Sequence, residues 1–389
     1  MVISLRSATP EDIDPCGHLY YEAFRSVSEG HDFPSDYPTI DSTLSLVEYR
    51  LNGTCNRILG SAFAANNQLV MAAMNRRFLC ERTSAPTNGL RRRNRYRPTV
   101  EVPAEGTGRF EITSASATET RMIEAWAARE GWKLGDMDTF AYAVADPGAL
   151  LIGRLDDVPI ASVLAIRYGE SFGFIGLYIT RADLRGSGYG RRMWRAAAAR
   201  LEGRLIGLDA VPAQQDRYMA MGLRPFWRNI HFRGVPRLAG VPPAGLELVD
   251  ATTLPFNVLA AYDCRFFPVP RNAFLTAWVR MPDARSLAAL HNGRMVGFGV
   301  SRPSGRTWSR IGPLYADSPE AAAAVLWSLA AAAPDRAAAI DAPEANPLAA
   351  VTMTRLGLEP GAHTVRMYDG TPPEVEHSGV YGTTSLEAS

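Results

Sequence analysis

The stretch Arg185-Gly186-Ser187-Gly188-Tyr189-Gly190 decides how this chain is interpreted. It lies between an apolar, strand-like run at 172–179 and a helix-like run at 191–201. Three alternating glycines leave backbone N–H groups uncovered, and the following helix adds unpaired N–H groups and the positive end of its dipole. Such loops bind phosphate, whereas a turn that merely caps a helix needs one glycine. We predict that a phosphate-bearing ligand is held by Arg185, Gly186, Ser187, Gly188, Tyr189, Gly190 and Arg191.

Three classes of phosphate-binding loop compete for this pattern. The P-loop of nucleotide hydrolases needs Lys-Ser/Thr after its last glycine, where this chain has Arg191-Arg192. A dinucleotide-binding loop would suit the strand, the helix and the later Asp209, but its glycines are spaced differently and follow the strand directly. The third pattern is Arg/Gln-x-x-Gly-x-Gly/Ala, which Arg185, Gly188 and Gly190 match. In this motif the chain resembles the acyl-CoA loop of GNAT-type N-acetyltransferases.

A second motif follows at the helix-like segment 215–221. Tyr218 precedes Gly222-Leu223 by one helical turn, and this spacing resembles the closing signature of GNAT domains. The resemblance implies that Tyr218 protonates the departing CoA thiolate. A phenol suits that role, because its ordinary pKa of about 10 exceeds that of a thiol, about 8.5. The alternative is a half-buried aromatic side chain that only packs against the sheet.

The wider resemblance runs from Arg109 to the C-terminus, through Glu130-Gly131-Trp132, Asp146-Pro147 and Gln214-Gln215-Asp216. It is to a bacterial GNAT subfamily whose members carry a second, degenerate GNAT-like domain. It implies an α+β fold with a mixed, mostly antiparallel sheet and flanking helices in tandem GNAT-like domains. The strand before the loop should diverge from the strand at 204–209. Main-chain groups of Tyr178 and Ile179 should then contact the pantetheine and the thioester of acetyl-CoA.

The resemblance also implies direct attack by an amine, without a covalent acyl-enzyme. Asp209 is the first candidate for the base and Glu170 a weaker one, although Asp209 could equally cap a turn. The first helices of the fold usually recognise the acceptor, and this points to Glu130, Trp132 and Asp138. Carboxylates beside a tryptophan suit a cationic amine, by charge and by cation–π contact, but a solvated loop is the alternative.

An internal repeat organises the chain. Short alternating strands that lead into amphipathic helices begin at Ile3, Phe110 and Leu246. The third copy runs from Tyr315 into an alanine-rich helix without a glycine loop, and it has Met353 where the second has Tyr218. One acyl-CoA site per chain is therefore expected. The predicted regions are a partial GNAT-like opening unit at 1–53, a basic linker or irregular segment at 54–108, a catalytic GNAT domain at 109–236 and a degenerate GNAT-like domain at 245–389.

Composition excludes few functions. The 389 residues are 47% hydrophobic and 21% charged with a net charge of +1, which is ordinary for a globular protein. The four cysteines show neither metal-ligand nor disulfide spacing, so we expect a reducing, cytoplasmic setting without a metal. No apolar run is long enough for a bilayer, so no membrane partner is expected. The basic stretch Arg91-Arg92-Arg93-Asn94-Arg95-Tyr96-Arg97 could touch RNA, but a solvated linker is preferred.

The sequence thus predicts a cytoplasmic N-acyltransferase that moves an acetyl group from acetyl-CoA to a small-molecule or peptide amine. An acyl-CoA-binding sensor without turnover is the alternative, and a nicotinamide-dependent oxidoreductase is a weaker one. Nothing in the sequence fixes the oligomeric state.

Overall fold

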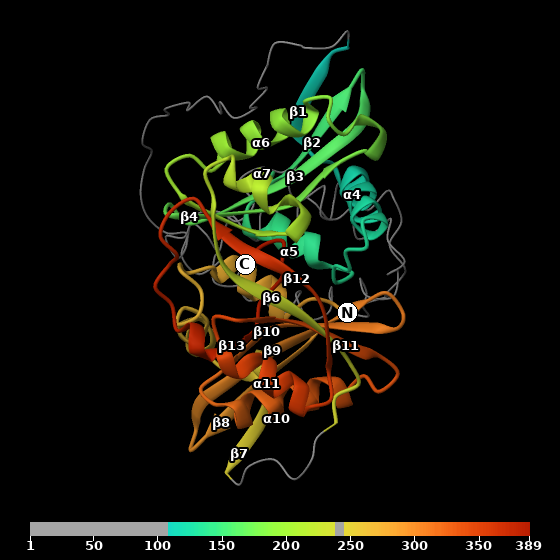
Figure 1. Ribbon diagram of the computed structural model, residues 1–389. Helices are drawn as coiled ribbons and strands as arrows, with labels where there is room; N and C mark the ends of the chain where they lie inside the picture. The colour runs from blue at the N-terminus through green and yellow to red at the C-terminus, as the bar shows by residue number, and fades with distance from the viewer. Residues whose placement is uncertain (1–107, 238–244) are drawn as a thin grey trace, which may run out of the picture. The chain divides into compact units, whose positions relative to one another are not determined.

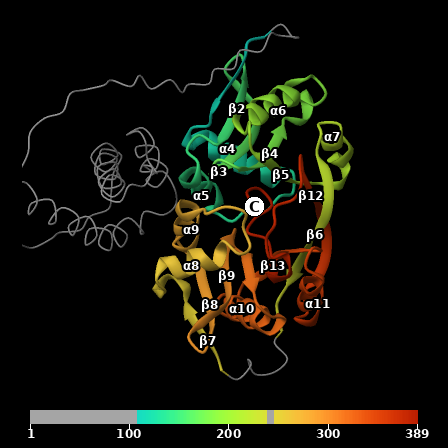
Figure 2. The same cartoon turned by 90° about the vertical axis from the view of Figure 1, so that its left-hand side faces the viewer.

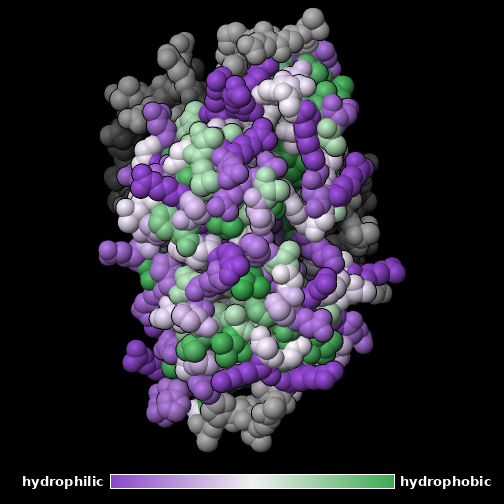
Figure 3. Space-filling model, in the orientation of Figure 1, coloured by the Kyte–Doolittle hydropathy of each residue, from purple (hydrophilic) through white to green (hydrophobic). Residues whose placement is uncertain are grey.

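A computed structural model describes residues 108–237 and 245–389. The expected opening unit at 1–53, nearly all of the expected linker at 54–108 and the basic stretch at 91–97 lie outside the described residues. Among the described helices, none is both long and apolar enough to cross a membrane. On the face seen in Figure 3, polar and apolar residues alternate, and no apolar belt runs across it.

The structure describes two of the three sequence repeats. The one that begins at Phe110 is called the first repeat below, and it consists of helices and strands. Its elements in chain order are β1 (Phe110–Ser114), α4 (Ala117–Arg129), α5 (Asp138–Ala145), β2 (Leu150–Leu155), β3 (Val158–Tyr168), β4 (Phe172–Thr180), α6 (Tyr189–Arg200), β5 (Leu205–Ala210), α7 (Gln215–Met219) and β6 (Arg224–Gly234).

The second repeat of the structure follows the same order and adds one short strand. Its elements are β7 (Leu246–Asp250), α8 (Phe256–Asp263), α9 (Asn272–Val279), β8 (Arg285–His291), β9 (Arg294–Ser304), β10 (Trp308–Ala316), α10 (Pro319–Ala331), β11 (Ala337–Pro343), α11 (Pro347–Arg355), β12 (Glu359–Tyr368) and β13 (Val380–Gly382).

The two repeats share one sheet and exchange their last long strands. The strand order is β1-β2-β3-β4-β5-β12-β6-β11-β10-β9-β8-β7. Strand β12 of the second repeat pairs with β5 of the first, whereas β6 of the first pairs with β11 of the second. Figure 1 shows β6 and β12 side by side at the centre. Most pairings are antiparallel, and β4–β5 and β10–β11 are parallel, which confirms the predicted mixed α+β fold.

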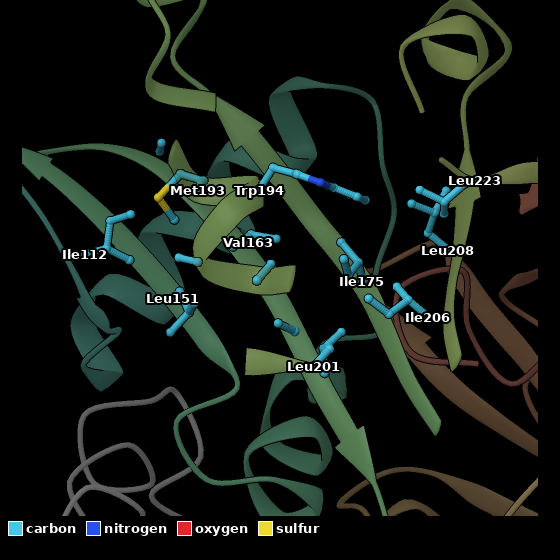
Figure 4. Close-up of a cluster of buried hydrophobic side chains, with 14 of the residues drawn as sticks. Ile112, Leu151, Val163, Ile175, Met193, Trp194, Leu201, Ile206, Leu208 and Leu223 are labelled. Atoms are coloured by element: carbon cyan, nitrogen blue, oxygen red, sulfur yellow. The ribbon is translucent and has the colours of Figure 1, made fainter. Parts of the chain in front are cut away.

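Each repeat packs a helix against its half of the sheet. In the first, Met193, Trp194 and Ala197 of α6 form one apolar face, spaced as an amphipathic helix requires. They meet Val163 and Ile175 of β3 and β4 in one buried cluster, part of which Figure 4 shows. Helix α6 therefore holds the glycine loop rigidly against the strands that precede it.

Candidate active site

The predicted phosphate loop leads into the N-terminus of α6. After a 3-10 turn at Ala182–Leu184, Gly186 and Gly188 adopt a left-handed backbone with φ of 88° each, and Gly188 is the N-cap of α6. Among the described residues, no acceptor lies opposite the N–H groups of Gly188 and of the first three helical residues. A Cβ added to either glycine would meet nothing within 4 Å. The loop therefore presents free amides to open space, as an anion site requires.

Two neighbouring residues brace this loop. A Cβ on Gly190 would lie 3.0 Å from the Tyr178 hydroxyl, which donates to Gly190 O at 2.5 Å, so the third glycine permits close packing of helix and strand. Arg185 donates to Thr180 O at 3.0 Å and forms an ion pair with Glu130. Glu130, predicted to contact the acceptor, thus lies at the mouth of the loop.

The strands before and after α6 diverge, as the resemblance implied. Strands β4 and β5 pair only from Phe172↔Leu205 to Ile175↔Leu208. Beyond Ile175, β4 has a bulge, where Leu177 has φ of 46° and its carbonyl oxygen accepts a hydrogen bond from the Ser162 hydroxyl at 2.9 Å. The last residues of β4 therefore border a gap in the sheet on the β5 side.

Three aromatic rings, from β4, α6 and α7, cluster beside the loop. Tyr218 lies 6.4 Å from Tyr178 and 5.7 Å from Trp194, between ring centroids. Among the described residues, nothing donates to or accepts from the Tyr218 hydroxyl. Burial raises the pKa of Tyr218, the neighbouring Tyr178 adds to the rise, and Arg217 opposes it. This phenol therefore keeps its proton at neutral pH.

Both repeats match models of known protein families. A model of the "Acetyltransferase (GNAT) family" matches residues 114–222, and one of the "Acetyltransferase (GNAT) domain" matches residues 259–382. The chain belongs to the GNAT superfamily. Its two GNAT-like domains follow one another in tandem, as the repeat predicted.

Two relatives extend this comparison. Holothin acyltransferase of Pseudoalteromonas sp. (strain SANK 73390) is 27% identical over 276 residues, which are 70% of this chain and 92% of the relative. The crystal structure of a candidate acetyltransferase from Pyrococcus horikoshii is 22% identical with a TM-score of 0.61, and the match covers 75% of this chain and 98% of that one. The first supports acyltransferase chemistry in this GNAT protein, and the second supports its fold.

In the second GNAT-like domain, the chain itself blocks the two features that form the candidate site in the first, the free helix N-terminus and the divergence of two strands. At the end of β10, the Ser318 side chain caps α10 by accepting from Ala321 N–H at 3.2 Å. Strands β10 and β11 also diverge, but β13 fills their gap by pairing with Leu314 and Tyr315 of β10. Thr383 N–H then donates to Asp341 O at 2.9 Å. In the second domain the chain itself therefore lies where, in the first, β4 and β5 separate without a strand between them among the described residues.

Asp209, the predicted base, is engaged elsewhere. Its side chain is fully buried, and its two oxygens accept from Arg366 at 2.9 and 2.8 Å, while Asn229 donates to it at 2.6 Å. Burial raises the pKa of Asp209, and Arg366 opposes the rise. To accept a proton from the acceptor amine, the Asp209 carboxylate would have to give up a hydrogen bond from Arg366 or Asn229. Glu170, the weaker candidate, lies exposed in the turn before β4, remote from the gap.

The predicted acceptor residues of the first helices join the two domains. Asp138 is buried at the start of α5, accepts from Gly135 N–H at 2.9 Å and forms an ion pair with Arg302 of β9. Trp132 is half-buried at the start of the same loop. Leu134 O accepts from the Ser304 hydroxyl at 2.6 Å. The loop therefore holds the domains together, and Figure 2 shows α5 beside α9 of the second domain.

A cavity of about 50 Å³ lies between the domains, beside the Asp209–Arg366 pair. Aromatic rings and prolines form most of its wall, and the rings are Phe172, Trp227, Phe266, Phe267, Tyr315, Tyr368 and His377. Two lining residues, Trp227 and Thr383, carry a buried hydrogen-bonding atom (Nε1 and Oγ1) without a partner among the described residues. Such atoms are rare in native proteins and favour a ligand or water in the cavity. Within residues 108–237 and 245–389, no cluster of His, Cys, Asp or Glu is arranged to hold a metal ion.

Sequence reasoning missed the C-terminal tail, residues 383–389. It is almost entirely buried between the domains, where Figures 1 and 2 both place the C-terminus. Tyr168 donates to Ala388 O at 2.7 Å, and the Tyr142 and Ser385 hydroxyls share a hydrogen bond of 3.0 Å. Two glycines at equivalent positions of the repeats, in Ile175-Gly176 and Ile311-Gly312, could have indicated the tail in the sequence. The tail's main chain crosses both, and a side chain at either position would collide with it.

Proposed function

We propose that this tandem GNAT protein is an N-acyltransferase that moves an acetyl group from acetyl-CoA to an amine within a ternary complex. The contrast between its two domains supports this most directly. In the first, free amides at the N-terminus of α6 adjoin the point where β4 and β5 diverge, whereas in the second Ser318 caps the helix and β13 pairs into the divergence. One acetyl-CoA per chain is the corollary.

The residues of the first domain fit acyl-CoA. We propose that the free amides of the loop, with Arg185 and Arg191, hold the pyrophosphate, because both supply positive charge to an anion. The divergence after Ile175 would admit the pantetheine arm, which is narrow and can hydrogen-bond to strand edges. Acyl-CoA would bring its thioester to the divergence after Ile175, and the protein would stabilise the charge and transfer the protons of the reaction.

Main-chain groups of β4 would polarise the thioester. Arg181 N–H donates to Ile160 O of β3 at 2.9 Å, and alternate residues of a strand direct their groups to the same side. The main-chain N–H and carbonyl groups of Ile179 therefore point toward β3, whereas the N–H of Tyr178 points toward the gap. We propose that Tyr178 N–H stabilises the oxyanion that forms when the amine attacks, an interaction worth about 3–4 kcal/mol in other acyl-transfer sites. Tyr218 then protonates the thiolate.

The aromatic cavity is our proposal for the place where the acceptor binds; at about 50 Å³ it is smaller than the ~150 Å³ that holds a benzene ring, so its walls must move apart on binding. It lies on the face of the sheet opposite α6, at the end of β4 that begins with Phe172, so the amine of a bound acceptor would have to extend along β4 to meet a thioester at the gap. Rings on several sides favour a planar group, and the Trp227 indole N–H would donate to it. The relative named holothin acyltransferase matches 70% of this chain and 92% of its own length. We propose the cytoplasm as the compartment, because the chain's cysteines show no disulfide pattern.

Release of free CoA thiol tests this function. Purified protein would be incubated with acetyl-CoA and one amine at a time: tryptamine, benzylamine, spermidine or a peptide with a free α-amino group. We expect release with an aromatic amine and a loss of about 10²–10⁴-fold in turnover for Tyr218→Phe, with little change in acetyl-CoA affinity. Binding of acetyl-CoA with no release for any amine, and no effect of Tyr218→Phe, would favour the sensor instead.

A further inference from the structure

Helix α7 lies beside the glycine loop because its Tyr218 packs against β4 and α6. The Tyr218 ring is 6.4 Å from Tyr178 of β4 and 5.7 Å from Trp194 of α6, between ring centroids. The Tyr178 hydroxyl in turn donates to Gly190 O, in the first turn of α6, at 2.5 Å. After α7 the chain continues into Leu223, which is buried in the same apolar cluster as α6. The residues next to Tyr218 in α7 therefore lie near the N-terminus of α6.

Arg217 of α7 is an exposed cation without a partner among the described residues. No hydrogen bond or ion pair from any of them reaches its guanidinium group. Asp216 comes directly before it, but consecutive residues of a helix do not face each other. The side chain of Arg191, in the first turn of α6, is likewise exposed and unpaired within the described ranges. Arg185 of the loop, by contrast, already forms an ion pair with Glu130.

Arg217 and Arg191 bring positive charge to the same place from two different helices. Burial raises the pKa of the Tyr178 phenol, and both arginines oppose this rise. Because the Tyr178 hydroxyl bonds to the first turn of α6, the two charges meet beside the free amides of that turn. Two like charges without a carboxylate between them repel each other. An anion bound there would remove the repulsion and receive charge from both sides.

We propose that Arg217 completes the pyrophosphate site from the side of α7 and thereby holds Tyr218 in position. The inference rests on the proposed function, in which the loop amides, Arg185 and Arg191 bind the pyrophosphate of the donor. Helix α7 has only five residues, and a helix this short depends on tertiary contacts for its stability. Contact between Arg217 and the bound donor would fix the helix that carries the adjacent acid. Arg217 is thus a binding and positioning residue, and it transfers no proton itself.

Two donors that differ in one phosphate test this proposal by isothermal titration: acetyl-CoA and acetyl-dephospho-CoA, which lacks only the 3′-phosphate. Arg217→Gln should weaken the binding of both by the same factor, about 10-fold, because both contain the pyrophosphate. The difference from the wild type should shrink as salt is added, since ions screen an exposed charge. Arg217→Lys should recover part of the affinity. Arg355→Gln, at an exposed arginine of the equivalent helix α11, should bind both donors as the wild type does.

Turnover tests the positioning of Tyr218 separately. At saturating acetyl-CoA, Arg217→Gln should lower kcat about 3- to 10-fold with the amine that gives the fastest CoA release in the screen above. In a Tyr218→Phe background the same substitution should still weaken acetyl-CoA binding but lower kcat no further, because the group that it positions is absent.

Five results would overturn the proposal in whole or in part. Wild-type affinity of Arg217→Gln would show that Arg217 does not contact the donor, and a loss seen only with acetyl-CoA would assign it to the 3′-phosphate. A loss that salt does not diminish, accompanied by a lower Tm, would assign it a structural role. An unchanged kcat would remove the positioning of Tyr218. Absence of acetyl-CoA binding by the wild type would contradict the proposed function itself and leave Arg217 without a ligand.

Discussion

Substituting Gly176 by alanine tests whether the tail lies on β4 as described. The added Cβ would lie 2.7 Å from the Glu387 Cα, whereas ordinary contacts begin at 3.4 Å. Because the nearest atoms are main chain, the tail must retreat by about 0.7 Å or more, the difference between these distances. Overpacking of this kind costs about 1–3 kcal/mol.

Thermal denaturation measures this cost. Since 1 kcal/mol shifts the Tm of a domain of this size by about 2–4 °C, Gly176→Ala should lower Tm by about 2–12 °C. Acetyl-CoA affinity should persist, since the phosphate loop lies on the other face of the sheet. Gly361→Ala is the milder comparison and should lower Tm less, because its Cβ would meet only His231 O, at 3.3 Å, just inside the ordinary contact distance. A Gly176→Ala protein with wild-type Tm would show that the tail does not pack there in solution.

Three further predictions follow from the buried groups. Asp209→Asn should lower the free energy of unfolding by about 3–5 kcal/mol, because it leaves Arg366 buried without its carboxylate; wild-type stability combined with a lost pH dependence of kcat/KM would instead make Asp209 the base. Trp227→Phe should raise KM for an aromatic acceptor about 5- to 10-fold and leave kcat nearly unchanged; an unchanged KM in steady-state assays would exclude the cavity. Because burial raises the pKa of Glu387 to about 7, the folded state binds its proton more tightly, so stability should fall as pH rises from about 4.5 to 7. Glu387→Gln should remove this fall in denaturant titrations, and its persistence would place the pKa shift elsewhere.

Sequence patterns predicted those features that depend on local chemistry. The glycine loop, the amphipathic face of α6 and the position of Tyr218 one turn before Gly222 are all set within a few residues, and the structure has each of them where expected. Asp209 showed the limit of such reasoning. Its partner Arg366 lies 157 positions away in sequence, so no local pattern marks the carboxylate as already paired.

The remainder of the site depends on long-range pairing. The sequence predicted no strand at β6 or β12, and a local pattern does not say which repeat's sheet a strand joins; the two strands are in fact exchanged between the repeats. The same holds for β13 and the tail, whose small and polar residues 382–389 look like an ordinary chain end. They are buried because the gap in the second domain and the face of Gly176 receive them.

The central claim is that acetyl-CoA binds at one loop per chain, in the first domain. Isothermal titration of the wild type with acetyl-CoA, beside Gly188→Asp, tests it most directly, because a carboxylate at Gly188 would meet the pyrophosphate at the end of α6. Gly203→Asp is the control, since Gly203 also has a positive φ and open space but lies beyond the other end of α6. We predict one site per chain in the wild type and in Gly203→Asp, and none in Gly188→Asp. Two sites per chain, or equal binding by Gly188→Asp, would contradict the account.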